Sequence, residues 1–131
     1  MTSLTGIRVL LVEDEGAIAM LIEEMLEDME CTVVASVAQL AKALQVATVV
    51  EADLAILDVN LAGERVFPVA RVLRARNIPF LFSTGYGVSG LPGEFADCPV
   101  LHKPFAEVDL RLKVALTLEY QAVKPATDRP V

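Results

Sequence analysis

Five polar side chains that could carry out phosphoryl chemistry each follow a short apolar run of the chain. They are Glu13, Asp14, Asp58, Thr84 and Lys103. Three carboxylates brought together would repel one another, and a hard divalent cation such as Mg²⁺, which prefers a few carboxylates plus waters and a phosphate, resolves that repulsion. A lysine adds a positive charge and a threonine adds a hydroxyl that can bind a phosphate oxygen. The set therefore predicts an aspartate that acts as nucleophile in phosphoryl transfer, with the metal and the lysine stabilising charge on the transferred group.

The elements that must position these residues can be read from the hydrophobic pattern. Short apolar, β-rich runs predict strands buried on both faces, and longer stretches with apolar residues at helical spacing predict amphipathic helices. The strands are expected at 8–12, 32–37, 54–57, 79–83 and 100–102, and the helices at 15–29, 38–47, 66–76 and 106–118.

The apolar residues of each helix predict which side faces the core. The predicted inward residues are Ala17, Ile18, Met20, Leu21, Met25 and Leu26 in the first helix, Leu40, Ala41 and Leu44 in the second, Val69, Val72 and Leu73 in the third, and Val108, Leu112, Ala115 and Leu116 in the last. For Ala17, Ile18 and Leu21 an exposed docking surface is an equally open interpretation.

Strands that alternate with helices predict a parallel sheet covered on both faces. Right-handed crossovers leave few topologies, and the flavodoxin-like strand order 2-1-3-4-5 is one of the two common ones. In such sheets ligands bind outside the carboxyl ends of the strands, which is where the five polar residues fall. The predicted fold class is therefore α/β, a doubly wound five-stranded parallel sheet with about five flanking helices.

The expected domain covers 6–119, and the residues 120–131, with two prolines and no periodicity, are expected to be a disordered tail. The segment 85–99 holds four glycines and two prolines, a composition that opposes a helix. We expect any fourth helix there to be short or mobile.

Composition narrows the function classes. The formal net charge is -7, which disfavours binding to nucleic acid or to an anionic membrane surface. Neither a signal peptide nor a membrane span is visible, so a cytoplasmic location is expected. Cys31 and Cys98 have no metal-ligand spacing with the single His102, and we interpret both as buried, reduced thiols.

Each site residue also has a structural explanation. The acids at 13–15 could favour the start of a helix, Asp58 could cap a turn, Thr84 could be an ordinary strand end, and Lys103 could be a surface charge. His102 is expected to be a partly buried strand residue and not a ligand. The occurrence of these residues at four strand ends together is what favours the functional interpretation.

At this point the sequence resembles the receiver domain of two-component response regulators, over about residues 6–119. The stretches that carry the resemblance are VLLVEDE with Glu13 and Asp14, LAILDVNL with Asp58, FSTGYG with Thr84, and LHKPF with Lys103. The resemblance implies a Mg²⁺ ion held by Asp14, Asp58 and the backbone carbonyl of Asn60, with Glu13 acting through water. It also implies a phosphoryl group passed to Asp58 from a histidine kinase or phosphotransfer protein and bound by Thr84 and Lys103. The Lys103–Pro104 bond is usually cis in this family.

Two features depart from the common receiver pattern. Receivers usually carry an aromatic residue three positions before the lysine, where this chain has Val100, so the usual aromatic coupling is in doubt. The run from Phe82 to Tyr86 resembles the subgroup nicknamed FAT GUY, which tends to pair with kinases of the HWE type. With no aromatic at position 100, we expect phosphorylation to act by ordering the segment 85–99.

Several functions remain to be separated. A phospho-switch acting through a downstream protein and a phosphate sink share the same chemistry, and too few residues follow the last helix for a DNA-binding output domain. The protein is expected to catalyse only its own phosphorylation and dephosphorylation.

A phosphatase of the haloacid dehalogenase type would need an acid where Asn60 stands. The phosphate site of a flavin-binding module would clash with Glu13 and Asp14. A degenerate receiver used only for docking is disfavoured because every site residue is present.

Overall fold

The central feature of the computed structural model is a five-stranded parallel sheet with the strand order β2-β1-β3-β6-β7. The structure describes residues 3–85 and 91–123. The five strands are Arg8–Val12 (β1), Thr32–Val37 (β2), Leu54–Asp58 (β3), Phe80–Thr84 (β6) and Val100–His102 (β7). This is the predicted flavodoxin-like order.

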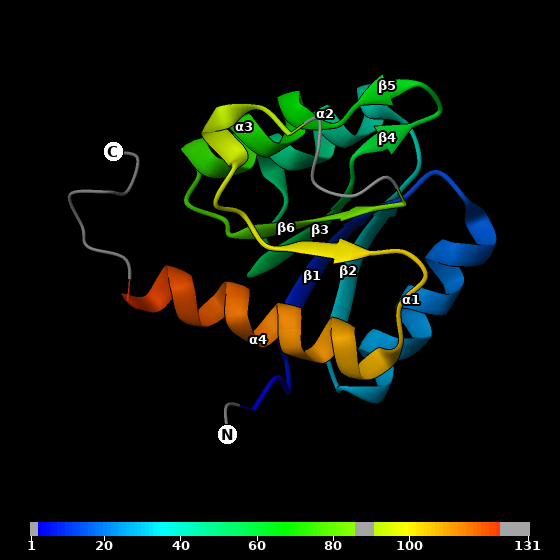
Figure 1. Ribbon diagram of the computed structural model, residues 1–131, viewed down its shortest axis with the longest axis vertical. Coiled ribbons are helices and arrows are strands. Elements are labelled where there is room, and N and C mark those ends of the chain that lie inside the picture. The colour runs from blue at the N-terminus through cyan, green and yellow to red at the C-terminus, as the bar shows by residue number, and fades with distance from the viewer. Residues whose placement is uncertain (1–2, 86–90, 124–131) are drawn as a thin grey trace.

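In the described part of the chain, four α-helices cover the two faces of the sheet, where about five were predicted. Figure 1 shows their arrangement. They are Gly16–Asp28 (α1), Leu40–Val49 (α2), Phe67–Ala75 (α3) and Glu107–Val123 (α4). Helices α2 and α3 lie on one face and α1 and α4 on the other. Two hydrophobic clusters result, because alternate residues of each buried strand point to opposite faces: Leu10 and Leu57 belong to one cluster, and Leu11 and Ile56 to the other.

Helices α1 and α3 end in the same way. After α1, Glu30 has a φ of 64° and Cys31 N–H donates to Leu26 O at 2.9 Å. After α3, Asn77 has a φ of 60° and Ile78 N–H donates to Leu73 O at 3.0 Å. Both ends are Schellman motifs, which satisfy the last helical carbonyls and turn the chain into β2 and β6.

The segment that joins β6 to β7 contains a single 3₁₀ turn, Gly93–Phe95, in its described part. Phe95 is fully buried and stacks on Phe67 at a centroid distance of 5.7 Å. Arg74 of α3 donates to Glu94 O at 2.9 Å, with its guanidinium 4.8 Å from the Phe95 ring centroid. In residues 91–99 the predicted fourth helix is therefore only this one short turn, as the composition predicted. Residues 86–90 of the predicted segment lie outside the described residues.

The predicted inward face of α4 was wrong. The buried residues of this helix are Leu110, Val114 and Thr117, whereas Val108, Leu112 and Leu116 are 60%, 63% and 52% exposed. The reason is that α4 carries two apolar stripes, and only the packing against the sheet decides which one is buried. The helix also continues to Val123, five residues beyond the prediction.

The faces of the other helices were predicted in part. In α1 the buried residues are Ala19, Ile22 and Leu26, and the residues Ala17, Met20 and Leu21 are exposed. In α2 the alanines at 43 and 47 are buried and Ala41 is exposed. The α3 stripe was predicted correctly, with Val69 and Leu73 buried and Val72 half-buried. In α1 and α2 the apolar residues occupy more than one side of the helix, so packing against the sheet decides which of them are buried.

Candidate functional site

The carboxyl ends of the sheet strands bring Glu13, Asp14 and Asp58 together. Each carboxylate offers one oxygen such that the three oxygens all lie within 4.8 Å of one another. Glu13 follows β1 and Asp58 ends β3, and these two strands are direct neighbours in the sheet. Glu13 and Asp58 are 3% and 6% exposed, so their charges are largely removed from water.

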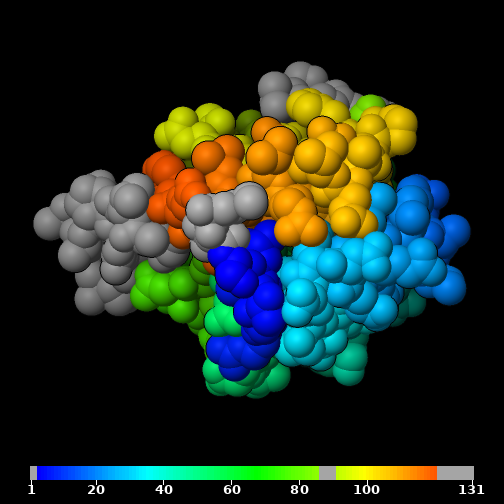
Figure 2. All heavy atoms as spheres, turned by 90° about the horizontal axis from the view of Figure 1, so that it is seen from below, coloured from blue at the N-terminus to red at the C-terminus, as the bar shows by residue number. Residues whose placement is uncertain are grey.

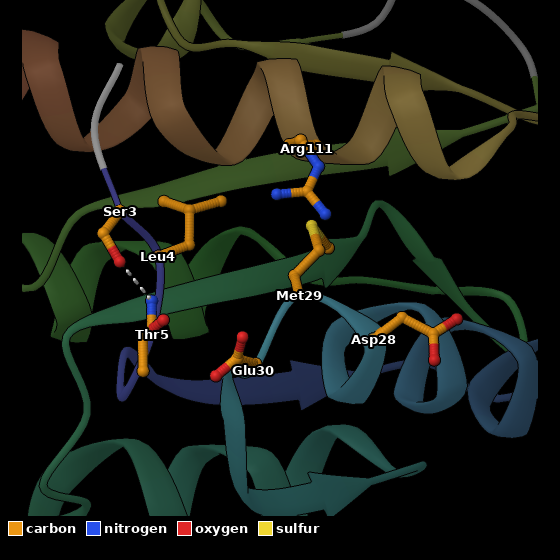
Figure 3. A pocket seen from close by; sticks show the side chains of 7 residues that line it. All are labelled: Ser3, Leu4, Thr5, Asp28, Met29, Glu30 and Arg111. Carbon is orange, nitrogen blue, oxygen red and sulfur yellow. Dashed lines mark hydrogen bonds between the residues drawn. The ribbon is translucent and has the colours of Figure 1, made fainter.

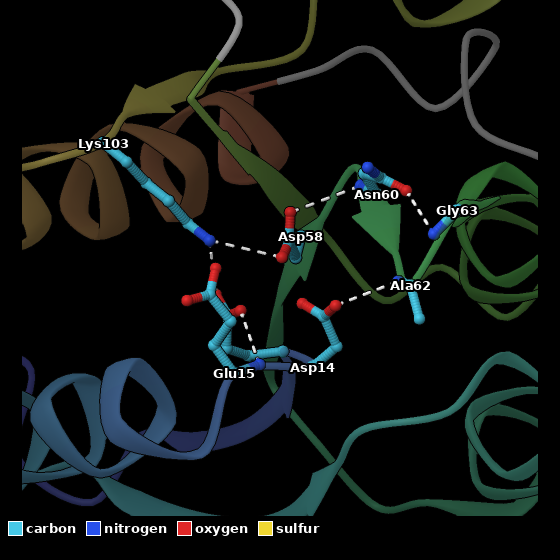
Figure 4. A network of polar contacts seen from close by, with 8 residues as sticks. Asp14, Glu15, Asp58, Asn60, Ala62, Gly63 and Lys103 are labelled. Carbon is cyan, nitrogen blue, oxygen red and sulfur yellow. Dashed lines mark hydrogen bonds and ion pairs between the residues drawn. The ribbon is translucent and has the colours of Figure 1, made fainter.

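Lys103 is the cation of this cluster (Figure 4). Its Nζ lies 2.8 Å from Glu13 Oε1 as an ion pair, and it donates a hydrogen bond of 3.2 Å to Asp58 Oδ2. Burial acts to lower the pKa of Lys103, but its contact with Glu13 and the charge of Asp58 outweigh burial and raise the pKa. The lysine is therefore charged at neutral pH and compensates part of the negative charge.

Asp58 holds a proton far more tightly than an ordinary aspartate. Burial is the main cause, and the hydrogen bond and charge of Glu13 add to it, so that the pKa of Asp58 rises to about 7. Lys103 and the backbone N–H of Asn60, 3.3 Å from Asp58 Oδ1, act in the opposite direction. The single positive charge of Lys103 thus does not balance the three carboxylates of the cluster.

Asp14 is oriented by a small hairpin that the sequence analysis missed. The strands Asn60–Leu61 (β4) and Glu64–Arg65 (β5) pair antiparallel around Ala62 and Gly63, whose φ values are 51° and 91°. Two successive positive φ angles are those of a type I′ turn, for which Ala-Gly is a weak sequence signal.

The turn contributes a backbone donor to the site. Ala62 N–H donates to Asp14 Oδ2 at 2.9 Å. Burial acts to raise the pKa of Asp14, but this hydrogen bond and those with Asp58 and Glu13 outweigh it and lower the pKa. Asp14 therefore stays ionised more readily than Asp58.

The remaining predicted residues also lie at this edge. Thr84 ends β6 and is 3% exposed, and its carbonyl accepts a hydrogen bond from Lys103 N–H at 2.9 Å. Asn60 begins β4 directly after Asp58, and its side-chain oxygen accepts from Gly63 N–H at 2.8 Å. The Lys103–Pro104 bond is cis. His102 is exposed, not partly buried as predicted, because β7 is an edge strand and its last residue points away from the clusters.

The donor set fits a hard divalent cation. Carboxylate oxygens from Glu13, Asp14 and Asp58 converge, and the raised pKa of Asp58 shows that a further positive charge is favoured there. The chain offers no histidine or cysteine to this cluster, and oxygen-only sites suit Mg²⁺ better than softer metals.

A hollow lies at the opposite end of the sheet from the acidic cluster, near the start of β1 and β2 (Figure 3). Its volume is about 250 Å³, and Asp28, Glu30 and Arg111 are among its lining residues. Charges of both signs line it, and none of the site residues above takes part. The chemistry of the molecule is therefore concentrated at the carboxyl edge.

A doubly wound parallel sheet that carries an acidic cluster and a largely buried lysine at its carboxyl edge defines an α/β domain with a candidate divalent-cation site. Residues 9–115 match the model of the response regulator receiver domain. The chain belongs to this family.

Solved structures support the assignment. The chain is 44% identical to SdrG from Sphingomonas melonis Fr1, covering 94% of this chain and 100% of that one, with a TM-score of 0.74. The BeF3-activated conformation of SdrG, from Pseudomonas melonis Fr1, is 43% identical over 90% of this chain and 99% of that chain, also with a TM-score of 0.74. The receiver domain of the sensor histidine kinase PA1611 from Pseudomonas aeruginosa PAO1, which has a magnesium ion in its active-site cleft, is 25% identical. That match covers 88% of this chain and 99% of that chain, with a TM-score of 0.75.

Two other comparisons complete the picture. No curated protein matches this chain with significance. Within residues 3–85 and 91–123, no helix is both long and apolar enough to cross a bilayer.

Val100, which replaces the usual aromatic residue, is buried beside Phe82, its register partner on β6. An aromatic ring reaches the same hydrophobic cluster from elsewhere: Phe95 contacts Phe82 edge-on at a centroid distance of 5.5 Å. The sequence analysis missed Phe95 because nothing in the local pattern shows that a residue of a glycine-rich loop is part of the core.

Proposed function

We propose that this protein is a phosphoacceptor response regulator of the cytoplasm, in which Asp58 receives a phosphoryl group in a Mg²⁺-dependent reaction. The observation that carries the proposal is the convergence of three carboxylates with Lys103, whose Nζ lies 3.2 Å from Asp58 Oδ2. The donor would be a histidine kinase or a phosphotransfer protein, as befits a member of the receiver family.

In the proposed step, a carboxylate oxygen of Asp58 attacks the phosphorus of a phosphohistidine. The new O–P bond forms as the P–N bond breaks, and the electron pair of that bond returns to the imidazole nitrogen. Asp14, Asp58 and the backbone carbonyl of Asn60 would hold Mg²⁺, with Glu13 acting through water. The metal supplies positive charge to the phosphoryl oxygens.

The protein's own groups complete the site. Lys103 already lies between Glu13 and Asp58, so its ammonium needs only a small shift to bind a phosphoryl oxygen. The Thr84 hydroxyl would bind another of these oxygens from the end of the adjacent strand. Lys103 thus has two roles in the proposal, as a substitute cation before transfer and as a phosphate ligand afterwards.

The phosphodonor would dock on helix α1, which begins directly after the acidic cluster. Met20 and Leu21 are 64% and 49% exposed, and the chain has no lysine or arginine between Arg8 and Lys42. Figure 2 shows part of α1 beside α4 at the surface. An exposed apolar pair on an acidic helix fits a partner helix with apolar side chains and basic flanks. Leu21→Glu should slow transfer from the cognate donor without changing phosphorylation by acetyl phosphate.

We further propose that the chain belongs to the FAT GUY subgroup, which would make an HWE-type kinase its donor. The supporting features are the Phe-Ser-Thr-Gly run at 82–85 and the buried Val100 at the aromatic position. The output would be a contact with a downstream protein. The alternative is a phosphate sink, and a pull-down that captures a partner preferring the phosphorylated form would count against it.

Incubation with acetyl phosphate and Mg²⁺, followed by intact-mass measurement, tests the proposed function. We expect a mass gain of one phosphoryl group that requires Mg²⁺ and is lost in Asp58→Asn. Asp53→Asn is the matched control, because Asp53 is a carboxylate paired with Arg8 at the other end of β3 and should not affect the reaction. No gain in the intact protein would show that the domain serves docking alone.

A further inference from the structure

Ser83 carries a buried hydroxyl that the proposed function does not use. The residue is 1% exposed, and its Oγ has no hydrogen-bond partner among the described residues. A buried hydroxyl without a partner is unfavourable, and most such groups in folded proteins are paired. The question is which group could pair with Ser83 Oγ in another state of the protein.

The sheet places Ser83 beside the phosphoacceptor. Ser83 on β6 is the register partner of Asp58 on β3, so their Cα atoms are direct neighbours across two parallel strands. Side chains alternate between the faces of a strand, and Leu81 and Ile56 belong to the α1/α4 cluster. Two residues farther along their strands, Ser83 and Asp58 therefore lie on that same face.

Lys103 must pass the same place. Strand β6 lies between β7, which Lys103 follows, and β3, where Asp58 lies, so the lysine side chain crosses the end of β6 to reach Asp58 Oδ2. The residues of β6 on this face become smaller toward that end, from Leu81 to Ser83 and then to Gly85, which follows the strand. Small side chains leave the space that the lysine occupies.

The ammonium of Lys103 has three protons, and Glu13 and Asp58 face two of them. Phosphorylation would turn the Asp58 carboxylate into an acyl phosphate, which moves negative charge from the carboxyl oxygens to the phosphoryl oxygens. The contact between Lys103 Nζ and Asp58 Oδ2 then weakens as the ammonium turns toward a phosphoryl oxygen. With Glu13 and that oxygen taking two of its protons, the third is available at the level of Ser83.

We propose that Ser83 is a positioning residue for Lys103, whose ammonium donates a hydrogen bond to Ser83 Oγ once Asp58 is phosphorylated. The hydroxyl is without a partner before transfer and paired after it, so it favours the phosphorylated state. This inference rests on the proposed function, because it requires that Asp58 accept the phosphoryl group.

The test is the affinity for beryllofluoride, used as a phosphoryl mimic, at saturating Mg²⁺ and followed by NMR. A hydrogen bond to a charged group of this kind changes an equilibrium roughly tenfold or more. Ser83→Ala should therefore weaken beryllofluoride binding about tenfold, leave the Mg²⁺ affinity unchanged, and not lower the melting temperature of the unliganded protein. If Ser83 had only a structural role, Ser83→Ala would instead lower the melting temperature of the unliganded protein. The ratio of its beryllofluoride affinity to its Mg²⁺ affinity would then equal that of the wild type.

A second pair of variants separates the hydroxyl from side-chain size. Ser83→Thr and Ser83→Val have the same shape, but only threonine keeps the hydroxyl, so Thr should again bind beryllofluoride about tenfold more tightly than Val. The ¹⁵N signal of the Lys103 ammonium should shift on beryllofluoride binding in the wild-type protein and shift less in Ser83→Ala. Equal affinities of wild type and Ser83→Ala, or of the Thr and Val variants, would overturn the inference.

The proposed function can fail separately. If the wild-type protein takes up neither beryllofluoride nor the phosphoryl group of acetyl phosphate, the role of Asp58 is wrong and the comparison of Ser83 variants loses its basis. If wild type binds beryllofluoride and Ser83→Ala binds it equally well, only the role of Ser83 is wrong.

Discussion

Without a divalent cation, the stability of this protein should fall as the pH rises from about 4 to about 7. The cause is Asp58, whose pKa is raised to about 7 by burial and by the hydrogen bond and charge of Glu13. In the unfolded chain an aspartate has a pKa near 3.9, so the native state binds this proton more tightly than the unfolded state does.

The size of the effect follows from the two pKa values. Each pKa unit corresponds to about 1.4 kcal/mol, so a rise of about 3 units amounts to roughly 4 kcal/mol. Below about pH 4 the Asp58 carboxyl is protonated in both the native and the unfolded state, so the free energy of unfolding does not vary with pH through this group. Between about pH 4 and pH 7 only the native state holds it, so the free energy of unfolding decreases by about 1.4 kcal/mol per pH unit and then levels off. The direction is opposite to that of an ordinary paired carboxylate.

Urea denaturation in the presence of EDTA, from about pH 4 to pH 8.5, measures this effect. Asp58→Asn removes the titrating group and keeps the shape of the side chain. The free energy of unfolding of wild type minus that of Asp58→Asn should therefore fall by roughly 4 kcal/mol across the range. The ¹³Cγ shift of Asp58 gives its pKa directly, and Glu13→Gln should lower that pKa because it removes the negative charge of Glu13, one of the causes of the rise.

Mg²⁺ provides an independent check, because its binding needs the ionised carboxylate. The apparent Mg²⁺ affinity should fall about tenfold for each pH unit below 7. A ¹³Cγ midpoint near 4, or a difference between wild type and Asp58→Asn that does not change with pH, would refute the electrostatic account of the site.

Three further predictions concern stability and can be measured by urea denaturation. Phe95→Ala should destabilise the protein by about 3–5 kcal/mol although it lies in a loop, since its ring is fully buried among three others; a loss below about 1 kcal/mol would contradict this packing. Leu110→Ala should cost about 2–5 kcal/mol and Leu112→Ala within about 0.5 kcal/mol, and the reverse order would mean that the wrong face of α4 is buried. Arg74→Met should cost about 1–2 kcal/mol by removing the hydrogen bond to Glu94 O and the contact with the Phe95 ring, whereas an unchanged midpoint would show that the 91–99 segment does not depend on α3.

The sequence alone determined the architecture and the polar residues of the site. Continuous apolar runs predicted strands buried on both faces, and alternation with helices then left few topologies. Because the carboxyl ends of parallel strands share one edge, Glu13, Asp14, Asp58 and Lys103 could be placed together without any coordinates. These inferences succeeded because they depend on strong local patterns and on one general rule of parallel sheets.

Only the tertiary structure decided how the elements pack and how the site is balanced. The pattern of α4 contains two apolar stripes, and the sheet, not the helix, determines that Leu110 is buried and Leu112 is exposed. Likewise, the backbone donor at Ala62 and the buried hydroxyl of Ser83 have no sequence signal, because both follow from which strands lie side by side. The raised pKa of Asp58 has the same origin: burial and the approach of Glu13 are properties of the folded chain, in which residues 45 positions apart share one low-dielectric site.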